Sequence, residues 1–358
     1  MRIKIIDGYR TIAVLGVLWS HCWMFFGNPQ MKYSGVNFSA ILAFFGTGVD
    51  LFFVISGFCM YLMYISKQDS FSLSAYLIYI KKRFLRIAPA FYTAIVVYAF
   101  FTANFIFKNI DWKYTLISAG FIRTFFSITT VYAPHFWSLA TEWHFYILLP
   151  LIVLCSKKMG FNRMVIIIVL LSLLFRFWFW RINVDPFNII NYSITNRIIE
   201  FLSGIVIAKL YLEKSDKWFC NSNIMIGVGV LIAFTGRLFM SASFQDRADF
   251  AGVFFRVMNL PLLSTGYALI IINSLNSSSY FSKFVGSKFM TFIGKYSYSM
   301  YLWHWIIAAY MSNLFLVYFK DTITLGLFLS FIFSVIILIP VSMISYHLLE
   351  SVYFKNKK

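Results

Sequence analysis

Ten stretches of this chain are apolar over roughly the length that a helix needs to cross a bilayer, about 20 residues. They lie near residues 6–26, 41–65, 84–107, 136–155, 164–181, 196–212, 223–241, 253–273, 290–317 and 322–348. Over all 358 residues, 60% are apolar or aromatic and only 12% are charged, whereas a soluble domain carries about 25% charged residues. A water-soluble fold is therefore excluded. We predict an all-α, polytopic integral membrane protein.

The basic residues predict how the spans are oriented. The chain has 31 Lys and Arg against 13 Asp and Glu, a net charge of +18. Lys and Arg concentrate in cytoplasmic loops, and ten spans with a cytoplasmic N-terminus place 20 of the 31 on that side. A further span over 115–131 would weaken this asymmetry, so we expect a short interfacial helix there. Both termini and the loop 273–288 are then cytoplasmic, and residues 1–358 form a single transmembrane domain.

Several common chemistries lack sequence support. The four cysteines form no C-x-x-C pair, which favours free thiols. P-loop, dinucleotide-binding, H-E-x-x-H and G-x-S-x-G motifs are all missing from the sequence. ATP-driven transport, dinucleotide redox chemistry, zinc proteolysis and serine hydrolysis thus lose their usual support, and no metal site is expected.

The first span carries two ionisable residues, Arg10 and His21, eleven positions apart. Helical periodicity places them on one face, about 16 Å apart along the axis. Because ionisable side chains at membrane depth are costly, each is a functional candidate. A buried histidine is often only a satisfied structural residue. An imidazole that titrates near neutrality is nevertheless the usual general base.

Four further charges, Asp50, Glu142, Arg197 and Glu200, fall where the predicted topology puts the outer half of the bilayer. His21 reaches the same depth, which favours a shared site. Each acid could instead serve as a helix N-terminal charge or a buried ion pair. Arg197 and Glu200, three positions apart, could pair with each other.

A basic cluster opens the third span at the cytoplasmic face, where Arg83 and Arg86 follow Lys81 and Lys82. It is either a positive-inside anchor or a cradle for an anion, since guanidinium groups bind phosphate through two parallel hydrogen bonds. In the ninth span, His304 stands between two tryptophans and could simply bridge helices.

Ordered motifs along the chain resemble membrane-bound acyltransferase family 3. DGYRTIAVLGVLWSH resembles the opening D-G-x-R followed by His, GTGVDLFFVISGF the second-span signature, and KKRFLRIAPAFY the R-x-x-R-I-x-P motif. HFWSLATEWHFY is similar to W-S-L-x-x-E, with Trp137, Ser138 and Glu142 in place. NRIIEFLSGIVIA, GKYSYSMYLWHW and SYHLLES follow in order, so the resemblance runs from about Ile5 to Glu350.

The chain departs from the family pattern at a few positions. Trp143 and His144 replace the usual second acid and glutamine, and Ser351 and Val352 follow Glu350 instead of Arg-Pro. The chain stops eight residues beyond Glu350, so we expect the standalone type, without the SGNH-type domain that many relatives carry.

The resemblance implies an O-acyltransferase in a bacterial cytoplasmic (inner) membrane, with an acyl-CoA donor, most often acetyl-CoA. Arg10, Arg83 and Arg86 would bind the CoA phosphates. His21 would act as general base, oriented by Glu142. Substrate binding or structural support would fall to a second set of residues: Asp50, Trp137, Ser138, Arg197, Glu200 and His304. Transfer could be direct or pass through an acetyl-histidine.

The acceptor implied by the resemblance is a hydroxyl of a cell-surface or lipid-linked saccharide, such as the O-antigen of lipopolysaccharide, a capsule or an exopolysaccharide. Two alternatives stay open. One is a polysaccharide or small-molecule transporter or flippase, whose binding site would lie near the bilayer midplane. The other is an MBOAT-type acyltransferase that uses His304. A nucleic-acid partner is not expected.

Overall fold

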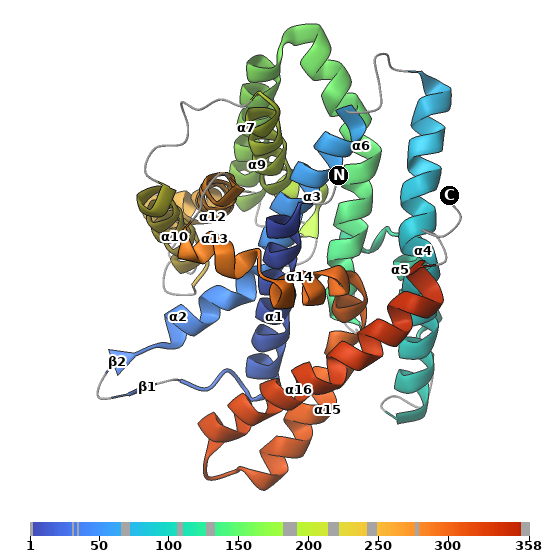
Figure 1. Ribbon diagram of the computed structural model, residues 1–358, viewed down its shortest axis with the longest axis vertical. Coiled ribbons are helices and arrows are strands. Elements are labelled where there is room, and N and C mark those ends of the chain that lie inside the picture. The colour runs from blue at the N-terminus through green and yellow to red at the C-terminus, as the bar shows by residue number, and fades with distance from the viewer. Residues whose placement is uncertain are drawn as a thin grey trace. The chain divides into compact units, whose positions relative to one another are not determined.

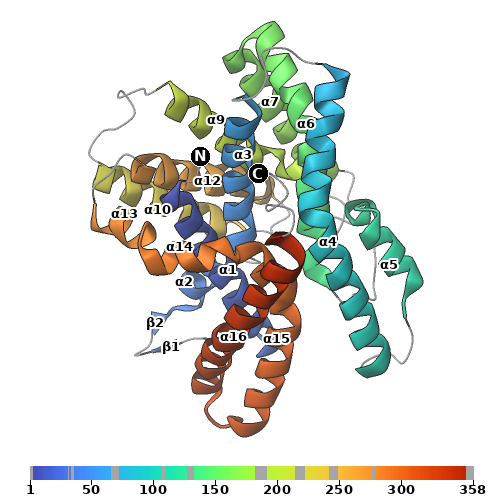
Figure 2. The same ribbon diagram turned by 45° about the vertical axis from the view of Figure 1, so that its right-hand side comes forward.

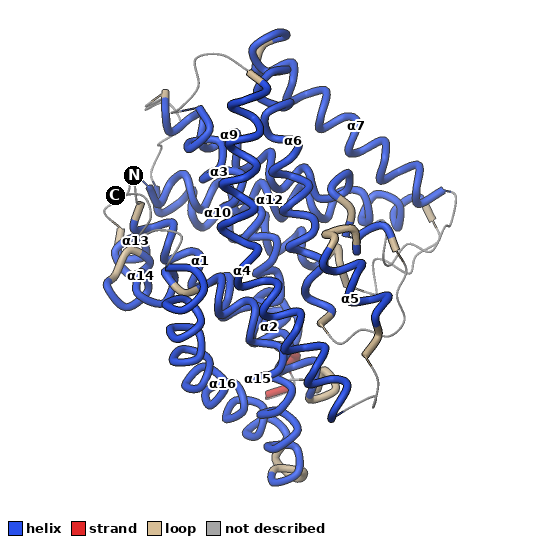
Figure 3. Tube along the Cα trace, turned by 90° about the vertical axis from the view of Figure 1, so that its right-hand side faces the viewer, coloured by secondary structure: helices blue, strands red, loops and turns tan. Residues whose placement is uncertain are grey.

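The computed structural model describes residues 3–30, 32–33, 36–65, 72–105, 110–126, 133–181, 192–213, 222–241, 249–275 and 279–351. Within these ranges the protein is built almost wholly from helices (Figure 3). The exception is an antiparallel pair of two-residue strands, β1 (Lys32–Tyr33) and β2 (Val36–Asn37). The predicted all-α class is confirmed.

Seven helical stretches of the described residues are long and apolar enough to cross a membrane. They are Ser39–Tyr64, Leu73–Phe101, Pro134–Met159, Phe161–Phe179, Phe250–Leu275, Ser297–Tyr318 and Ile323–Glu350. Each of the ten predicted spans overlaps helical residues, although the second and the ninth each cover more than one helix. Three predicted spans are not among these seven stretches: α1 (Lys4–Phe25), α9 (Ile194–Leu212) and α10 (Ser222–Leu238), which is apolar but shorter. The chain is a multi-pass membrane protein.

The helices group into two compact units, of which unit 1 comprises residues 1–52, 89–94 and 277–358. Its elements are α1, α2 (Ser39–Phe44), a 3₁₀ turn (Phe45–Thr47), α13 (Tyr280–Val285), α14 (Lys288–Lys295), α15 (Ser297–Tyr318), α16 (Ile323–Ser345) and a π-helical turn (Tyr346–Glu350). α15 and α16 run side by side as an antiparallel pair (Figures 1 and 2).

Small polar residues line the contact among α1, α15 and α16. Ser312, Ser330 and Ser334 are buried there, and the Cys22 Sγ lies 3.9 Å from the Ser334 Oγ. In the absence of a hydrophobic driving force between lipid-embedded helices, small residues allow close approach and hydrogen bonding. Cys22, Cys59 and Cys155 are free thiols, as predicted, and Cys220 lies outside the described residues.

Unit 2 comprises residues 53–88 and 95–276. Its elements are most of α3 (Gly48–Ile65), most of α4 (Leu73–Phe105), α5 (Trp112–Ala119), α6 (Trp137–Met159), α7 (Phe161–Arg181), α9, α10 and α12 (Phe250–Leu275). The backbones of α3 and α9 are in direct contact at two glycines, Gly57 and Gly204. Side chains larger than hydrogen at Gly57 or Gly204 would overlap the carbonyl oxygen of Phe201 or Val54.

Three predicted boundaries are wrong. The third span was expected from residue 84, but α4 begins at Leu73, because the charges of Lys81–Arg83 lower hydropathy without breaking a helix. The ninth was expected from residue 290, but α14 and α15 are separate helices that meet at Tyr296. The predicted loop 273–288 contains the end of α12 and the whole of α13.

The segment 115–131 does not form one helix. α5 ends at Ala119, and a 3₁₀ turn follows at Arg123–Phe125. Arg123 donates hydrogen bonds to the Tyr114 hydroxyl and to the carbonyl oxygens of Ala133 and Pro134. Burial raises the pKa of the Tyr114 phenol, so the phenol stays protonated and donates to the Ala133 carbonyl at 2.6 Å. The predicted short helix is thus present only as α5, which covers residues 115–119 of the segment, and residues 127–131 lie outside the described residues.

Candidate active site

His21 and His304 form a direct hydrogen bond within unit 1. The Nδ1 of His21 lies 2.9 Å from the Nε2 of His304, across 283 positions of sequence. α1 carries the first ring and α15 the second, and the ring centroids are 4.9 Å apart. The other ring nitrogen of His304, Nδ1, lies 2.6 Å from the carbonyl oxygen of Tyr301.

This chain of contacts assigns the protons. A carbonyl oxygen only accepts hydrogen bonds, so the Nδ1 of His304 carries a proton and donates to Tyr301. The Nε2 of a neutral His304 is then an acceptor, and the Nδ1–H of His21 donates to it. The Nε2 of a neutral His21 is consequently left unprotonated, as a general base requires.

The surroundings of the two rings differ. His304 is fully buried, whereas His21 is partly exposed. Trp305 packs edge-to-face against His21 at 4.8 Å between centroids, and Phe25 packs on Trp305 at 5.0 Å. The buried His304 ring thus hydrogen-bonds to the partly exposed His21 ring, which also packs against Trp305.

The other predicted residues of unit 1 lie on α1 and α3. The continuous helix α1 confirms that Arg10 and His21 share one helix, and the Nη1 of Arg10 lies 2.8 Å from the Asp7 carboxylate. Asp50 is buried in the first turn of α3. A carboxylate there is favoured by the partial positive charge of a helix N-terminus, which fits the structural interpretation of Asp50.

Glu142 belongs to unit 2, where it accepts two hydrogen bonds. Its Oε1 lies 2.6 Å from the Ser56 hydroxyl of α3 and 2.5 Å from the Tyr146 hydroxyl, one turn further along α6. The structure therefore brings Glu142 together with two hydroxyl donors that the sequence analysis did not single out. The spacing of Glu142 and Tyr146, four positions apart, was an available signal.

Arg83 and Arg86 lie inside α4, ten and thirteen positions after its first residue. The Arg83 guanidinium lies over the Tyr79 ring at 5.9 Å, and its Nη1 is 3.6 Å from the Met60 sulfur, a weak acceptor. In the described part of the chain, the buried Nε of Arg83 and the buried hydroxyl of Tyr79 have no hydrogen-bond partner. The Tyr79 hydroxyl and the Arg83 Nε, one turn apart on α4, are therefore buried donors that no described residue satisfies.

Trp137, Arg197 and Glu200 form a second cluster in unit 2. Trp137 stacks on Tyr192 with centroids 4.4 Å apart, and the Arg197 guanidinium lies over its ring at 5.1 Å. Arg197 also pairs with the fully buried Glu200 at 3.3 Å, so the predicted Arg197–Glu200 pair is present. The Ser138 hydroxyl donates to the carbonyl oxygen of His135 at 3.1 Å, beside the start of α6.

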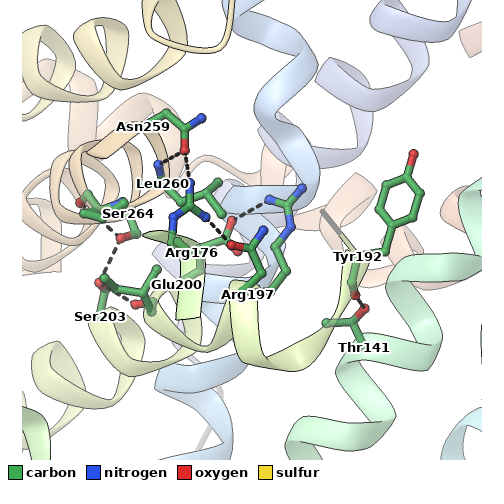
Figure 4. Close-up of polar contacts among 12 residues, drawn as sticks. Thr141, Arg176, Tyr192, Arg197, Glu200, Ser203, Asn259, Leu260 and Ser264 are labelled. Atoms are coloured by element: carbon green, nitrogen blue, oxygen red, sulfur yellow. Dashed lines mark hydrogen bonds and ion pairs between the residues drawn. The ribbon is translucent and has the colours of Figure 1, made fainter. Parts of the chain in front are cut away.

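Arg176 forms the most extensive hydrogen-bond network that was not predicted from the sequence. It is buried on α7, and its guanidinium donates to the side chains of Asn196 and Asn259 and to two α12 carbonyls, those of Arg256 and Val257. Figure 4 shows the contact with Asn259. An arginine inside an apolar span was itself a signal.

The reason for this network is the proline in α12. Pro261 lacks the N–H that would bond to the Val257 carbonyl, and the N–H of Leu260 bonds to the Asn259 side chain at 2.6 Å. The carbonyls of Arg256 and Val257 are thereby released, and Arg176 donates to both.

We expect replacement of Arg176 by methionine to lower the unfolding midpoint of the purified protein by many degrees. Each buried acceptor left without a partner costs about 1–3 kcal/mol, and several would be left. The matched control is Arg163→Met, since Arg163 is an exposed residue of the same helix. Equal midpoints for the two variants, measured by thermal unfolding in one detergent, would contradict this account.

Two departures from the family pattern, Trp143 and His144, are packing residues, whereas Ser351 donates to the His347 carbonyl and Val352 lies outside the described residues. Trp143 contacts the rings of Phe84 and Phe121, and His144 contacts the ring of Phe125. Among the described residues, no group of three or more His, Cys, Asp or Glu side chains is arranged to hold a metal ion.

The fold is that of a multi-pass helical membrane protein, and its paired histidines suit proton transfer to or from a substrate. The profile of the acyltransferase 3 family, described as an acyltransferase domain, matches residues 3–347. The chain belongs to that family. This confirms the resemblance seen in the sequence, and it favours that family over the MBOAT-type alternative.

Curated relatives carry a consistent description. The chain is 27% identical over 331 residues to O-acetyltransferase OatA of Staphylococcus aureus strain NCTC 8325 / PS 47, an alignment covering 86% of this chain and 51% of that protein. OatA of strains COL and MRSA252 matches at the same identity and coverage. The chain spans about half the length of the curated relatives it matches. No solved structure matches it.

Proposed function

We propose that this protein is an O-acetyltransferase that moves an acetyl group from acetyl-CoA to a hydroxyl of a cell-surface or lipid-linked saccharide. The observation that carries the proposal is the chain Tyr301 carbonyl–His304–His21, which leaves the Nε2 of a partly exposed histidine unprotonated. Family membership and the O-acetyltransferase names of the relatives support the same reaction.

In the proposed reaction, the Nε2 of His21 takes the proton of the acceptor hydroxyl. The hydroxyl oxygen forms a bond to the thioester carbon, the carbon–sulfur bond breaks, and the CoA sulfur leaves as a thiolate. His21 then returns its proton to that thiolate. His304 keeps the Nδ1–H of His21 in place throughout, and the hydrogen bond strengthens while His21 carries a positive charge.

For the donor, we propose that Arg83 and Tyr79 bind a phosphate of CoA, with Arg86 of the same helix adding positive charge. The support is chemical. The Nε of Arg83 and the Tyr79 hydroxyl are buried donors with no hydrogen-bond partner among the described residues, and guanidinium suits phosphate. Arg10 of unit 1 stays a predicted CoA-binding residue, and its Nη1 lies 2.8 Å from the Asp7 carboxylate.

The roles of the remaining predicted residues also belong to the proposal. Because the Nδ1 of His21 is bonded to His304, we assign the orienting role to His304. Glu142 stays a predicted catalytic residue, bonded to Ser56 and Tyr146. Trp137 and Arg197 are candidates for saccharide binding. The protein would act in a bacterial cytoplasmic membrane, on O-antigen, capsule or exopolysaccharide.

The donor assignment is tested with the double variant Arg83→Gln/Arg86→Gln. We expect the KM for acetyl-CoA to rise at least about tenfold, because a hydrogen bond to a charged group is worth about 1.5–3 kcal/mol. The measurement is transfer of radiolabelled acetyl from acetyl-CoA to extracted surface glycan, using membranes that contain the full chain.

The matched control is Arg163→Gln, which removes an exposed positive charge elsewhere. An unchanged KM in the double variant would rule out the phosphate assignment. Glycan movement across the membrane without any consumption of acetyl-CoA would overturn the proposed function in favour of a transporter.

A further inference from the structure

Residues 279–296 join two membrane spans. α12 ends at Leu275, α15 begins at Ser297, and both are long and apolar enough to cross a membrane, so we expect residues 279–296 at a membrane face. It folds into α13 and α14, of six and eight residues. Helices of that length rise only about 9–12 Å, too little to enter and cross a bilayer.

The two short helices bury one side and expose an aromatic and basic one. Val285, Met290 and Ile293 are buried. The opposite side exposes five aromatic and three basic residues: Tyr280, Phe281, Phe284, Phe289, Phe292, Lys283, Lys288 and Lys295. Tyr280 is 92% exposed and Phe289 is 66% exposed. No Asp or Glu occurs between residues 279 and 296, so the exposed side carries charge of one sign.

The buried side is fixed to the start of α1. The hydroxyl of Thr11 donates to the Met290 carbonyl at 2.5 Å. Any side chain larger than hydrogen at Gly8 would overlap the carbonyl of Val285, and one at Gly294 would overlap that of Asp7. This close backbone contact places α13 and α14 at the same end of α1 as the chain's N-terminus.

We infer that α13 and α14 form an interfacial surface that binds the anionic phospholipids of the leaflet on that side. Ammonium groups attract lipid phosphates, and aromatic rings partition into the headgroup region. Cation–π contacts hold two of the lysines: Lys283 lies 5.8 Å from the Tyr280 ring, and Lys295 lies 5.0 Å from the Tyr346 ring. Charge complementarity selects an anionic lipid surface over a neutral one.

The inferred surface has a consequence for α1. α1 is not among the seven helices that are apolar enough to cross a membrane by their own composition. Binding of α13 and α14 to the membrane surface would fix the position of α1 relative to the bilayer, which the composition of α1 does not do by itself. The depth of His21, ten positions after Thr11 on the same helix, is set partly by this anchor.

The test compares the full chain with the triple variant Lys283→Gln/Lys288→Gln/Lys295→Gln. Detergent-solubilised protein is titrated with phosphatidylglycerol, and apparent affinity is read from the rise in unfolding midpoint. Each lysine near an anionic surface contributes about 1 kcal/mol, about fivefold in affinity, so we expect roughly a hundredfold loss. The control is Lys113→Gln/Lys158→Gln/Lys320→Gln, which removes three other exposed lysines.

Hydrogen exchange in nanodiscs locates the effect. Residues 279–296 of the unmodified chain should exchange more slowly with phosphatidylglycerol present than in phosphatidylcholine alone, and this difference should vanish in the triple variant. Equal affinity loss in the control, or equal protection by both lipids, would overturn the inference. Protection that appears only when another protein is added would assign the surface to a protein partner instead.

Discussion

Replacing His21 by alanine is expected to lower acetyl transfer by about 10²–10⁴-fold, the usual contribution of a general base. His21 is the partly exposed member of the histidine pair, and the contacts of the pair leave its Nε2 unprotonated. His304 is fully buried, and both of its nitrogens are engaged, one with Tyr301 and one with His21. The measurement is the rate of acetyl transfer from acetyl-CoA to surface glycan, in membranes that contain equal amounts of each variant.

The control for the His21 prediction is His347→Ala. His347 is exposed on the π-helical turn after α16, and we assign it no part in the reaction. Membrane insertion and unfolding midpoint are checked for both variants, because the His21→Ala protein must be folded for its rate to be informative. Normal acetylation of the glycan by folded His21→Ala would mean that the general-base mechanism is wrong.

Hydropathy predicted where the long helices lie, because each membrane span must satisfy its own backbone hydrogen bonds. A hydropathy profile records only the average polarity of a segment, which explains why some helix boundaries were wrong and some short helices were missed. α4 starts eleven residues earlier than the predicted span, since Lys81, Lys82 and Arg83 lower the hydropathy but are good helix formers. α13 was missed because its exposed charge makes the segment look like a loop in a one-dimensional profile, and most of α14 was merged with the ninth predicted span.

The spacing of residues within one helix predicted contacts between near neighbours in the sequence. It did not predict contacts between residues on different helices. Arg197 and Glu200, one turn apart, pair as their spacing indicates. The contact of His21 with His304 joins α1 to α15, and it depends on how α15 packs against α1. The Arg176 network likewise depends on carbonyls that Pro261 releases on another helix, which no local pattern reveals.

Replacing His304 is expected to produce the second large loss of acetyl-transfer rate. The size of this loss should depend on which residue replaces His304. His304→Ala removes the acceptor of the His21 Nδ1–H, so the His21 ring can rotate or change tautomer. In Ser-His-Asp enzymes, loss of the group that fixes the tautomer costs on the order of 10⁴ in kcat. A neutral imidazole partner is weaker than a carboxylate, and we expect about 10²-fold for His304→Ala.

The conservative variants separate positioning from packing. A glutamine at 304 can place its side-chain oxygen near the former Nε2 and accept from His21, whereas asparagine more nearly replaces the Nδ1 that bonds to Tyr301. We therefore expect kcat to fall in the order wild type, Gln, Asn, Ala, with the KM for acetyl-CoA unchanged. A purely structural role would lower all three variants in step with their unfolding midpoints. Complete loss in His304→Ala with normal transfer in His21→Ala would instead make His304 the base. The order of kcat at matched stability thus tests whether the buried histidine acts through the accessible one.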